Sequence, residues 1–460
     1  MKRYSLLALL FVSIFAFTSV LTGCGGGEEE CVNRASEGVV YNFDEQFRDV
    51  VELRVWLDDE DYFNALKVAF EAANPDIILN FTEVGSVDVR QRLELYSGST
   101  QAADVVVYPH DHIGAALQSG LLAAIEGTQA TDIRTRMIDS AWQTASTCYD
   151  FATNAIIDCV GDDPGTLFGA PLVGESVALF YNKALLREWT GSDTPPTTFE
   201  QIIAQAALYA DKLDGEPIIG LDVGNAYDMH FVTTAFGFEL FGPEGLDANQ
   251  PNLASPAVVN GLTWFNQTLR PAVDPGRVLN ASELNGDANK SRFESGLIPY
   301  MITGPWNISD FLAAGIELGV TLIPTINGEQ PTSFSGVQLA SVYRQSRNPD
   351  AAFRLLEFMT SPEGLAILYA EKNVLPALKD VSVVEGVAED AYLSGISEQL
   401  NFSVPMPIIP EMGFFWSNAG SMYSQAWNGT RSPQRAAAIA NNGFVEQSGF
   451  GTAVDLPQED

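Results

Sequence analysis

The chain has 460 residues, enough for two or three folding units, and its 24 Lys+Arg against 59 Asp+Glu give a formal net charge of −35. Hydrophobic residues make up 46% of the chain, which excludes an acidic disordered tail because disorder requires low hydrophobicity. The negative field of such a body repels nucleic-acid phosphates and anionic lipid headgroups, so neither is expected as a partner of the folded part. A neutral or cationic ligand is compatible with this charge.

The first 23 residues have the features of an export signal. A basic start precedes an apolar run at 6–17 and a small-residue segment that ends at Cys24, and the run is too short for a stable membrane span. Residues 21–24, Leu-Thr-Gly-Cys, resemble the lipobox of bacterial lipoproteins, which implies cleavage before Cys24 and lipidation of its side chain. An ordinary export signal with an incidental cysteine is the alternative. The Gly- and Glu-rich residues that follow predict a flexible tether over 24–50.

The remaining cysteines are Cys31, Cys148 and Cys159. In an oxidising exterior, Cys148 and Cys159 are close enough in sequence to form one local disulfide, which leaves Cys31 unpaired in the tether. The stretch 148–163 around this pair has weak periodicity, which predicts a surface insertion. No Cys-x-x-Cys pair occurs, so zinc-binding or thioredoxin-type chemistry has no support.

Apolar periodicity predicts strands and helices in βαβ order near the N-terminus. Later, Asn348 and Ser361 each precede a proline and an apolar-periodic stretch, which predicts two more helices. The fold class is therefore predicted to be α/β, with helices covering mainly parallel sheets. The N-terminal strands are predicted over 52–56, 77–84 and 104–108, and the helices over 61–73, up to Tyr96 and from 111 to 120.

The common catalytic motifs are missing from the sequence. It contains no Gly-x-Ser-x-Gly elbow, no Gly-Lys-Ser/Thr phosphate loop and no His-Glu-x-x-His zinc helix. His110-Asp111-His112 is either a metal chelate or a loop after a strand, and the loop is favoured because no other His or Cys cluster supplies the remaining ligands. We therefore predict no cofactor. A glycosidase carboxylate pair stays open, because 59 acidic residues always offer candidates.

Four stretches of the chain match one protein family in the family's own order. They read ADVVVYPHDH (103–112), APLVGESVALFYNK (170–183), MITGPWN (301–307) and PIIPEMGFFW (407–416). Together they resemble the maltose/maltodextrin-binding proteins, which are the extracellular solute-binding proteins of bacterial ABC sugar importers. The resemblance runs from about Leu53 to Ser432.

The resemblance implies a sugar site that combines aromatic platforms with carboxylates. Sugar rings expose C–H patches that stack on aromatic faces, and their hydroxyls need oriented acceptors. Alternatives remain open: core packing for the tryptophans and for Tyr227, a helix N-cap for Asp111, and a surface salt bridge for Glu175. The expected sugar-binding residues are Tyr108, Asp111, His112, Glu175, Tyr227, Trp306 and Trp416.

The chain departs from the family at several of these positions. Tyr108 replaces the usual tryptophan, and His112 and Gly420 stand where arginine is common. Glu60-Asp61 stand where the family tends to have an acid and a lysine. The changes at 60–61, 112 and 420 remove cationic donors, so the resemblance does not fix the same sugar or the same sugar orientation.

The family architecture is the two-lobed periplasmic-binding-protein fold, with the chain crossing between lobes at a hinge. The first lobe is expected to contain 51–174 plus about 337–395, and the second 175–336 plus about 396–450. The implied protein is a monomeric, non-catalytic receptor. It binds maltose, maltodextrin or a related α-glucoside between its lobes and delivers it to the transmembrane subunits of an ABC permease. Lipid on Cys24 anchors it in the periplasm or at the cell surface. The alternatives are an exported glycoside hydrolase, a receptor for another sugar and a scaffold without a small ligand.

Overall fold

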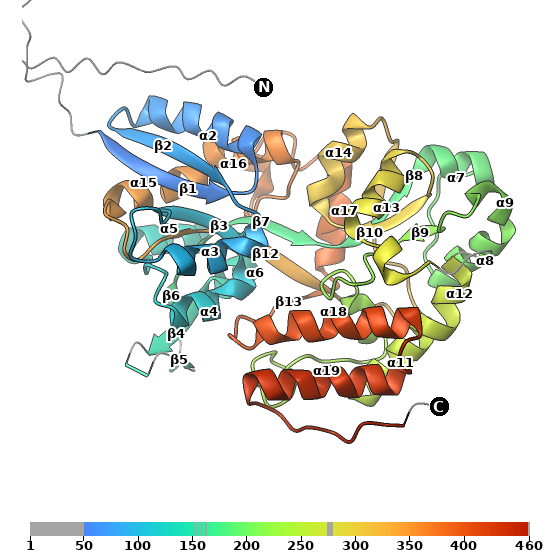
Figure 1. Ribbon diagram of the computed structural model, residues 1–460. Coiled ribbons are helices and arrows are strands. Elements are labelled where there is room, and N and C mark those ends of the chain that lie inside the picture. The colour runs from blue at the N-terminus through green and yellow to red at the C-terminus, as the bar shows by residue number, and fades with distance from the viewer. Residues whose placement is uncertain are drawn as a thin grey trace, which may run out of the picture. The chain divides into compact units, whose positions relative to one another are not determined.

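The computed structural model describes residues 50–458, except for residues 151, 154, 158, 162 and 274–278. The predicted leader, Cys24 and Cys31 lie outside the described residues, as does nearly all of the predicted tether. Two separate sheets, each covered by helices, form the framework (Figure 1). No helix in the described part of the chain is long and apolar enough to cross a membrane.

The first sheet combines three strands from the N-terminal third of the chain with three strands from later parts of it. Its strands are β1 (Val51–Leu57), β2 (Ile77–Glu83), β3 (Val105–Pro109), β7 (Ala170–Ser176), β12 (Ser333–Val342) and β13 (Ser403–Pro405). The strand order is β13-β12-β3-β1-β2, and β7 pairs with β12. β1 is parallel to β2 and to β3, as the βαβ pattern predicts, whereas β12 is antiparallel to β3 and β7.

The helices that the sequence predicts around this sheet lie within about two residues of their predicted bounds. The side chain of Asp59 accepts a hydrogen bond from the backbone N–H of Tyr62 and so caps α2 (Glu60–Ala73), which ends at Asn74. Gly120 follows α4 (Ile113–Gln118) at φ +65°, a conformation that favours glycine. The other helices are η1 (Ser86–Asp88), α3 (Val89–Tyr96), η2 (His110–His112), α5 (Gly127–Arg136), α6 (Asp139–Thr144), α15 (Pro349–Met359), α16 (Pro362–Lys372) and η6 (Val381–Val383).

The second sheet consists of β8 (Ala178–Asn182), β9 (Ile219–Gly220), β10 (Tyr300–Thr303) and β11 (Leu318–Thr321), in the order β11-β8-β10-β9. β8 is antiparallel to both β10 and β11, and β10 is parallel to β9. The expectation of a mainly parallel sheet is therefore wrong here. The α/β class itself is confirmed.

A second hydrophobic core surrounds this sheet and its helices. α18 (Met412–Asn428) and α19 (Pro433–Ser448) pack side by side (Figure 1). The other helices of this part are α7 (Lys183–Thr190), α8 (Phe199–Leu208), α9 (Ala210–Leu213), α10 (His230–Thr234), α11 (Pro256–Trp264), η3 (Phe265–Leu269), α12 (Arg270–Val273), η4 (Ala281–Glu283), α13 (Gly286–Glu294), η5 (Pro305–Asn307) and α14 (Ile308–Ala313).

The chain passes between the two sheets along paired strands. β7 continues through Val177 into β8, and β12 returns from the second sheet to the first beside β7 (Figure 1). A later passage leads to α17 (Ala391–Leu400), which packs against β11. Gly395 permits this packing, because an added Cβ would lie 2.5 Å from the carbonyl oxygen of Val320. The predicted lobe boundary near 395 therefore falls inside a helix that is attached to the second sheet.

A small three-stranded sheet lies at the predicted surface insertion. Its strands are β4 (Ser146–Asp150), β5 (Ala155–Ile157) and β6 (Thr166–Leu167). A disulfide joins Cys148 to Cys159, the pair indicated by the sequence spacing, with a Cα–Cα distance of 5.3 Å. Val160 is 87% exposed, so this excursion lies at the surface.

Candidate functional site

A cleft of about 1460 Å³ is lined by residues that both sheets position. The first sheet contributes the turn after β3 and the facing strands β7 and β12. The second contributes the loop before α10, the turn η5 after β10, and the start of α18. Because Asp111 and Trp306 each follow the carboxyl end of a strand, the cleft occupies the usual ligand position of open α/β sheets.

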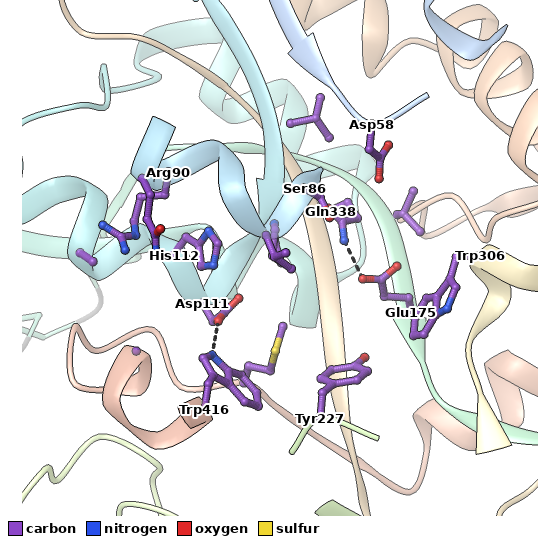
Figure 2. Close-up of a pocket in the computed structure, with 18 of the residues that line it drawn as sticks. Asp58, Ser86, Arg90, Asp111, His112, Glu175, Tyr227, Trp306, Gln338 and Trp416 are labelled. Atoms are coloured by element: carbon purple, nitrogen blue, oxygen red, sulfur yellow. Dashed lines mark hydrogen bonds between the residues drawn. The ribbon is translucent and has the colours of Figure 1, made fainter. Parts of the chain in front are cut away.

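Asp111 is held by a tryptophan from the other side of the cleft. Nε1–H of Trp416 in α18 donates a hydrogen bond of 2.9 Å to Oδ2 of Asp111 (Figure 2). Asp111 is 6% exposed, and its Oδ1 has no hydrogen-bond partner. The alternative role as a helix cap is not observed, because α4 begins after His112 and no side chain caps it. Asp111, a lining residue, therefore keeps one buried acceptor oxygen without a partner in the protein.

Glu175 lies in the strand β7 where it faces β12. Nε2 of Gln338 donates a hydrogen bond of 2.7 Å to Oε1 of Glu175 (Figure 2). Gly336 pairs with Glu175 across the two strands, and an added Cβ there would lie 2.9 Å from Cγ of Glu175. Burial raises the pKa of Glu175 to about 7, and the Gln338 hydrogen bond opposes this rise only in part. No ion pair of Glu175 occurs in the described part of the chain, so the salt-bridge alternative is not supported.

Glu175→Gln is expected to make folding less dependent on pH. The folded protein retains the Glu175 proton up to about pH 7, whereas the unfolded chain loses it near 4.5, so this residue lowers stability as pH rises between these values. Relative to the unsubstituted protein, the free energy of unfolding of the variant should therefore increase by about 3 kcal/mol from pH 4.5 to 7.5. Urea unfolding at several pH values measures the difference. Glu446→Gln, at an exposed position, is the control, and a Glu175→Gln difference as flat as the control would contradict the prediction.

Three aromatic rings form one wall of the cleft. The ring of Tyr227 lies 6.2 Å from that of Trp306 and 6.5 Å from that of Trp416, measured between centroids. Trp306 is 41% exposed, so its ring face is available to a ligand. An added Cβ on Gly304 would come well inside 3.0 Å of the Trp306 ring, which explains the glycine of the Gly-Pro-Trp motif. Both tryptophans and Tyr227 thus lie where the sequence analysis places them.

Tyr108 does not line the cleft, and the expectation that it stacks on a ligand is wrong. Side chains alternate along a strand, and Val107 and Pro109 face the cleft. Tyr108 therefore points to the opposite side, where it is 2% exposed and its hydroxyl shares a hydrogen bond of 3.1 Å with Ser341. His112 does line the cleft, with its ring stacked on Tyr108 and its Nδ1 without a partner.

His110 joins three segments behind the cleft. Its Nδ1 accepts a hydrogen bond of 3.0 Å from the backbone N–H of Val337, and its Nε2 donates one of 3.0 Å to the carbonyl of Met406. Burial lowers the pKa of His110, so the neutral ring is maintained. With both ring nitrogens engaged, His110 cannot act as a metal ligand. The His-Asp-His stretch is therefore a structural turn that orients Asp111.

The sequence analysis missed several polar residues that face the cleft. These residues are Tyr62, Asp228 and Gln338. Together with three predicted residues they give six buried side-chain atoms of lining residues that have no hydrogen-bond partner: the hydroxyl of Tyr62, Oδ1 of Asp111, Nδ1 of His112, the hydroxyl of Tyr227, Oδ1 of Asp228 and Oε1 of Gln338. Buried polar atoms in folded proteins normally have partners, so these atoms indicate a polar ligand. Gln338 is 163 residues from Glu175, and no sequence pattern connects them. Asp228 directly follows Tyr227, which was predicted as a site residue, so its position in the sequence could have indicated it as a candidate.

Comparisons with known proteins agree with this architecture. The family model described as "Bacterial extracellular solute-binding protein" matches residues 65–393. Two similar proteins are the maltotriose-binding protein of Pyrococcus abyssi (26% identity, 77% of this chain and 72% of that protein) and the galactooligosaccharide-binding protein of Bacillus subtilis (25%, 93% and 94%).

Solved structures of two binding proteins show the same architecture. A cyclo/maltodextrin-binding protein complexed with maltotetraose matches with a TM-score of 0.65 and 27% identity, over 86% of this chain and 97% of that one. The maltotriose-binding protein of Thermus thermophilus matches with a TM-score of 0.70 and 22% identity, over 86% and 98%. The chain has the two-lobed periplasmic-binding fold, and it belongs to the bacterial extracellular solute-binding protein family.

Proposed function

We propose that the protein is the sugar-binding receptor of an ABC importer and that it binds an oligosaccharide, preferably an α-glucoside, in the cleft. One observation carries the proposal: the cleft combines an aromatic wall with six buried polar atoms of lining residues that lack partners. Sugars supply both complements, because their C–H faces stack on aromatic rings and their hydroxyls hydrogen-bond. The names of the relatives, which include maltotriose-binding and galactooligosaccharide-binding proteins, support this ligand class.

The roles of the site residues follow from their positions. Trp306 and Tyr227 offer ring faces to the sugar, and Trp416 both contributes a ring and orients Asp111. Asp111 and Glu175 offer carboxyl oxygens that accept hydrogen bonds from sugar hydroxyls. His112 adds a neutral ring nitrogen, because burial lowers its pKa.

Lobe closure couples binding to delivery. The proposed lobes are 51–174 plus about 337–395 and 175–336 plus about 396–450; the attachment of α17 to β11 favours a boundary near 390. A sugar that contacts both lobes stabilises the closed form by its differential affinity, and the permease then recognises that form. The receptor is proposed to be a monomer, anchored through lipid on Cys24 in the periplasm or at the cell surface. Cys24→Ala should abolish labelling by radioactive palmitate, and unchanged labelling would contradict the anchor.

Titration calorimetry with maltotriose, maltose, trehalose, cyclodextrin and a galactooligosaccharide tests the ligand class. We expect saturable heat with at least one α-glucoside, and absence of heat with every sugar would overturn the proposal. The protein is also proposed to perform no reaction. Incubation with the same sugars and with chromogenic glycosides should therefore release no product, whereas steady turnover abolished by Glu175→Gln would identify a glycosidase.

A further inference from the structure

Both permanent cations that line the cleft are already paired with carboxylates. Among the described lining residues these cations are Arg90 and Lys372. Nη1 of Arg90 lies 3.0 Å from Oε2 of Glu94, and Nζ of Lys372 lies 2.7 Å from Oδ1 of Asp58. His112 is the remaining basic group, and its burial lowers its pKa. The cleft therefore offers little positive charge to an incoming anion.

Carboxyl groups are available in the same cleft. Asp111 and Asp228 are each 6% exposed, and each has an Oδ1 without a partner. Asp222 lies close enough to influence Asp228 electrostatically: burial and then the charge of Asp222 raise the pKa of Asp228 well above its ordinary value. Within the described residues no ion pair joins a cation to the following lining carboxyls: Asp111, Glu175, Asp222, Asp228 and Glu411.

The unpaired carboxyl groups of the cleft have opposite effects on the binding of anionic and cationic ligands. An anionic ligand would be buried beside carboxyls without a cationic partner, and an unpaired buried charge is costly. An ammonium group would instead find acceptors, and its positive charge would offset the burial that raises the pKa of Asp228. The cleft thus has carboxyl groups that can pair with a cationic ligand, whereas its own cations are already paired with carboxylates.

We propose that the cleft selects sugars by charge, accepting uncharged and amino sugars and rejecting sugars that carry a carboxylate or a phosphate. The inference rests on the proposed sugar-binding function and adds a specificity to the same site. Asp228, beside the aromatic wall, is the main determinant of the preference for a positive charge, and Asp222, Asp111 and Glu175 contribute to the field. Repulsion between like charges weakens the binding of wrong ligands, so charge complementarity adds more to specificity than to affinity for the correct ligand.

Three matched trisaccharides test the proposal. They are maltotriose and its derivatives with an amine or a carboxylate in place of the hydroxyl at C6 of either terminal glucose, and a galactooligosaccharide set is prepared in the same way. By calorimetry at pH 7.5 and low salt we expect the amine to bind about tenfold more tightly than the parent sugar and the carboxylate about tenfold more weakly. Both ratios should shrink as salt is raised, because salt screens charge. Amine binding should release a proton, detected as heats that differ between buffers of different ionisation enthalpy.

Asp228→Asn keeps the shape of the side chain and removes its ability to ionise. We expect the ratio of the affinity for the amine to the affinity for the parent sugar to fall toward one. The proton release on amine binding should fall toward that measured with the parent sugar. Glu446→Gln removes a carboxylate at an exposed position outside the cleft and should leave the ratios unchanged. If Asp228→Asn does not fold, Glu175→Gln tests the same reduction of the ratios.

The outcomes separate this inference from the proposed function. Equal affinity for the three sugars of a set, or tighter binding of the carboxylate, would overturn the charge selection and leave the sugar receptor intact. No binding by any member of either set would overturn both. Ratios that persist in Asp228→Asn and Glu175→Gln would also overturn the inference, because the selectivity would then arise elsewhere.

Discussion

Trp306→Ala and Trp416→Ala are each expected to weaken sugar binding by about 1–3 kcal/mol, the scale of burying one apolar side chain. The ring of Trp306 is 41% exposed at the cleft, so a bound sugar covers a surface that is apolar in the free protein. Trp416 should show the larger loss, because its removal also frees the Asp111 oxygen that its indole N–H holds at 2.9 Å. Calorimetry with the best sugar from the panel measures both losses.

Two further variants separate stacking from the hydrogen bond. Trp416→Phe keeps an aromatic ring and loses the N–H donor, so its affinity should lie between those of the unsubstituted protein and Trp416→Ala. Trp189→Ala removes a half-buried tryptophan outside the cleft and is expected to leave affinity unchanged. If Trp306→Ala and Trp416→Ala bind sugar as well as Trp189→Ala does, both cleft tryptophans are structural and the aromatic wall has no role in recognition.

Local sequence patterns were sufficient for the N-terminal part of the fold. The segments that become β1, α2 and β2 each carry their own periodicity and end signals, and the structure confirms them within one or two residues. Asp59 and Asn74, at the two ends of α2, act through neighbours in sequence. Such features are readable because the interactions that fix them are local.

The strand order and strand directions of the second sheet were harder to predict from the sequence. β8 follows β7 after one residue and belongs to a different sheet, and its neighbours β10 and β11 come from more than a hundred residues later. The sequence of a short buried strand does not show whether its neighbours run parallel or antiparallel to it, because both of its faces are apolar in either case. The expectation of parallel strands therefore failed there.

The candidate site shows the same division. Trp306, Trp416 and Glu175 could be placed because each lies in a motif with a recognisable neighbourhood. Tyr108 was wrongly predicted to face the cleft. It lies within β3, where successive side chains point to opposite faces, whereas Asp111 lies in the turn after the strand and does not follow this alternation. The alternation could therefore have shown that Tyr108 and Asp111 need not face the same side. Gln338 could not be found, because its contact with Glu175 depends on the register of two strands that are distant in sequence.

Gly114→Ala is expected to destabilise the fold by about 1–3 kcal/mol, the range for inserting a methyl group into a packed site. Gly114 lies in α4, and an added Cβ would come well inside 3.0 Å of the carbonyl oxygen of Ile408, with the ring of Pro410 also in contact. A backbone carbonyl cannot rotate away as a side chain does. The segment 406–411 would therefore have to move, although His110 fixes it at the carbonyl of Met406.

That movement should also reach the cleft. Segment 406–411 leads directly into α18, so its displacement separates Trp416 from Asp111, and sugar affinity should fall together with the free energy of unfolding. Gly413→Ala is the matched control for stability alone, because Gly413 lines the cleft: no atom lies within 4 Å of its added Cβ, and alanine favours a helix by up to about 1 kcal/mol over glycine. Urea unfolding of both variants, and calorimetry of Gly114→Ala beside the unsubstituted protein, decide the point. If Gly114→Ala is as stable as Gly413→Ala, the close approach does not constrain the segment, and the orientation of Trp416 must be set within the second core alone.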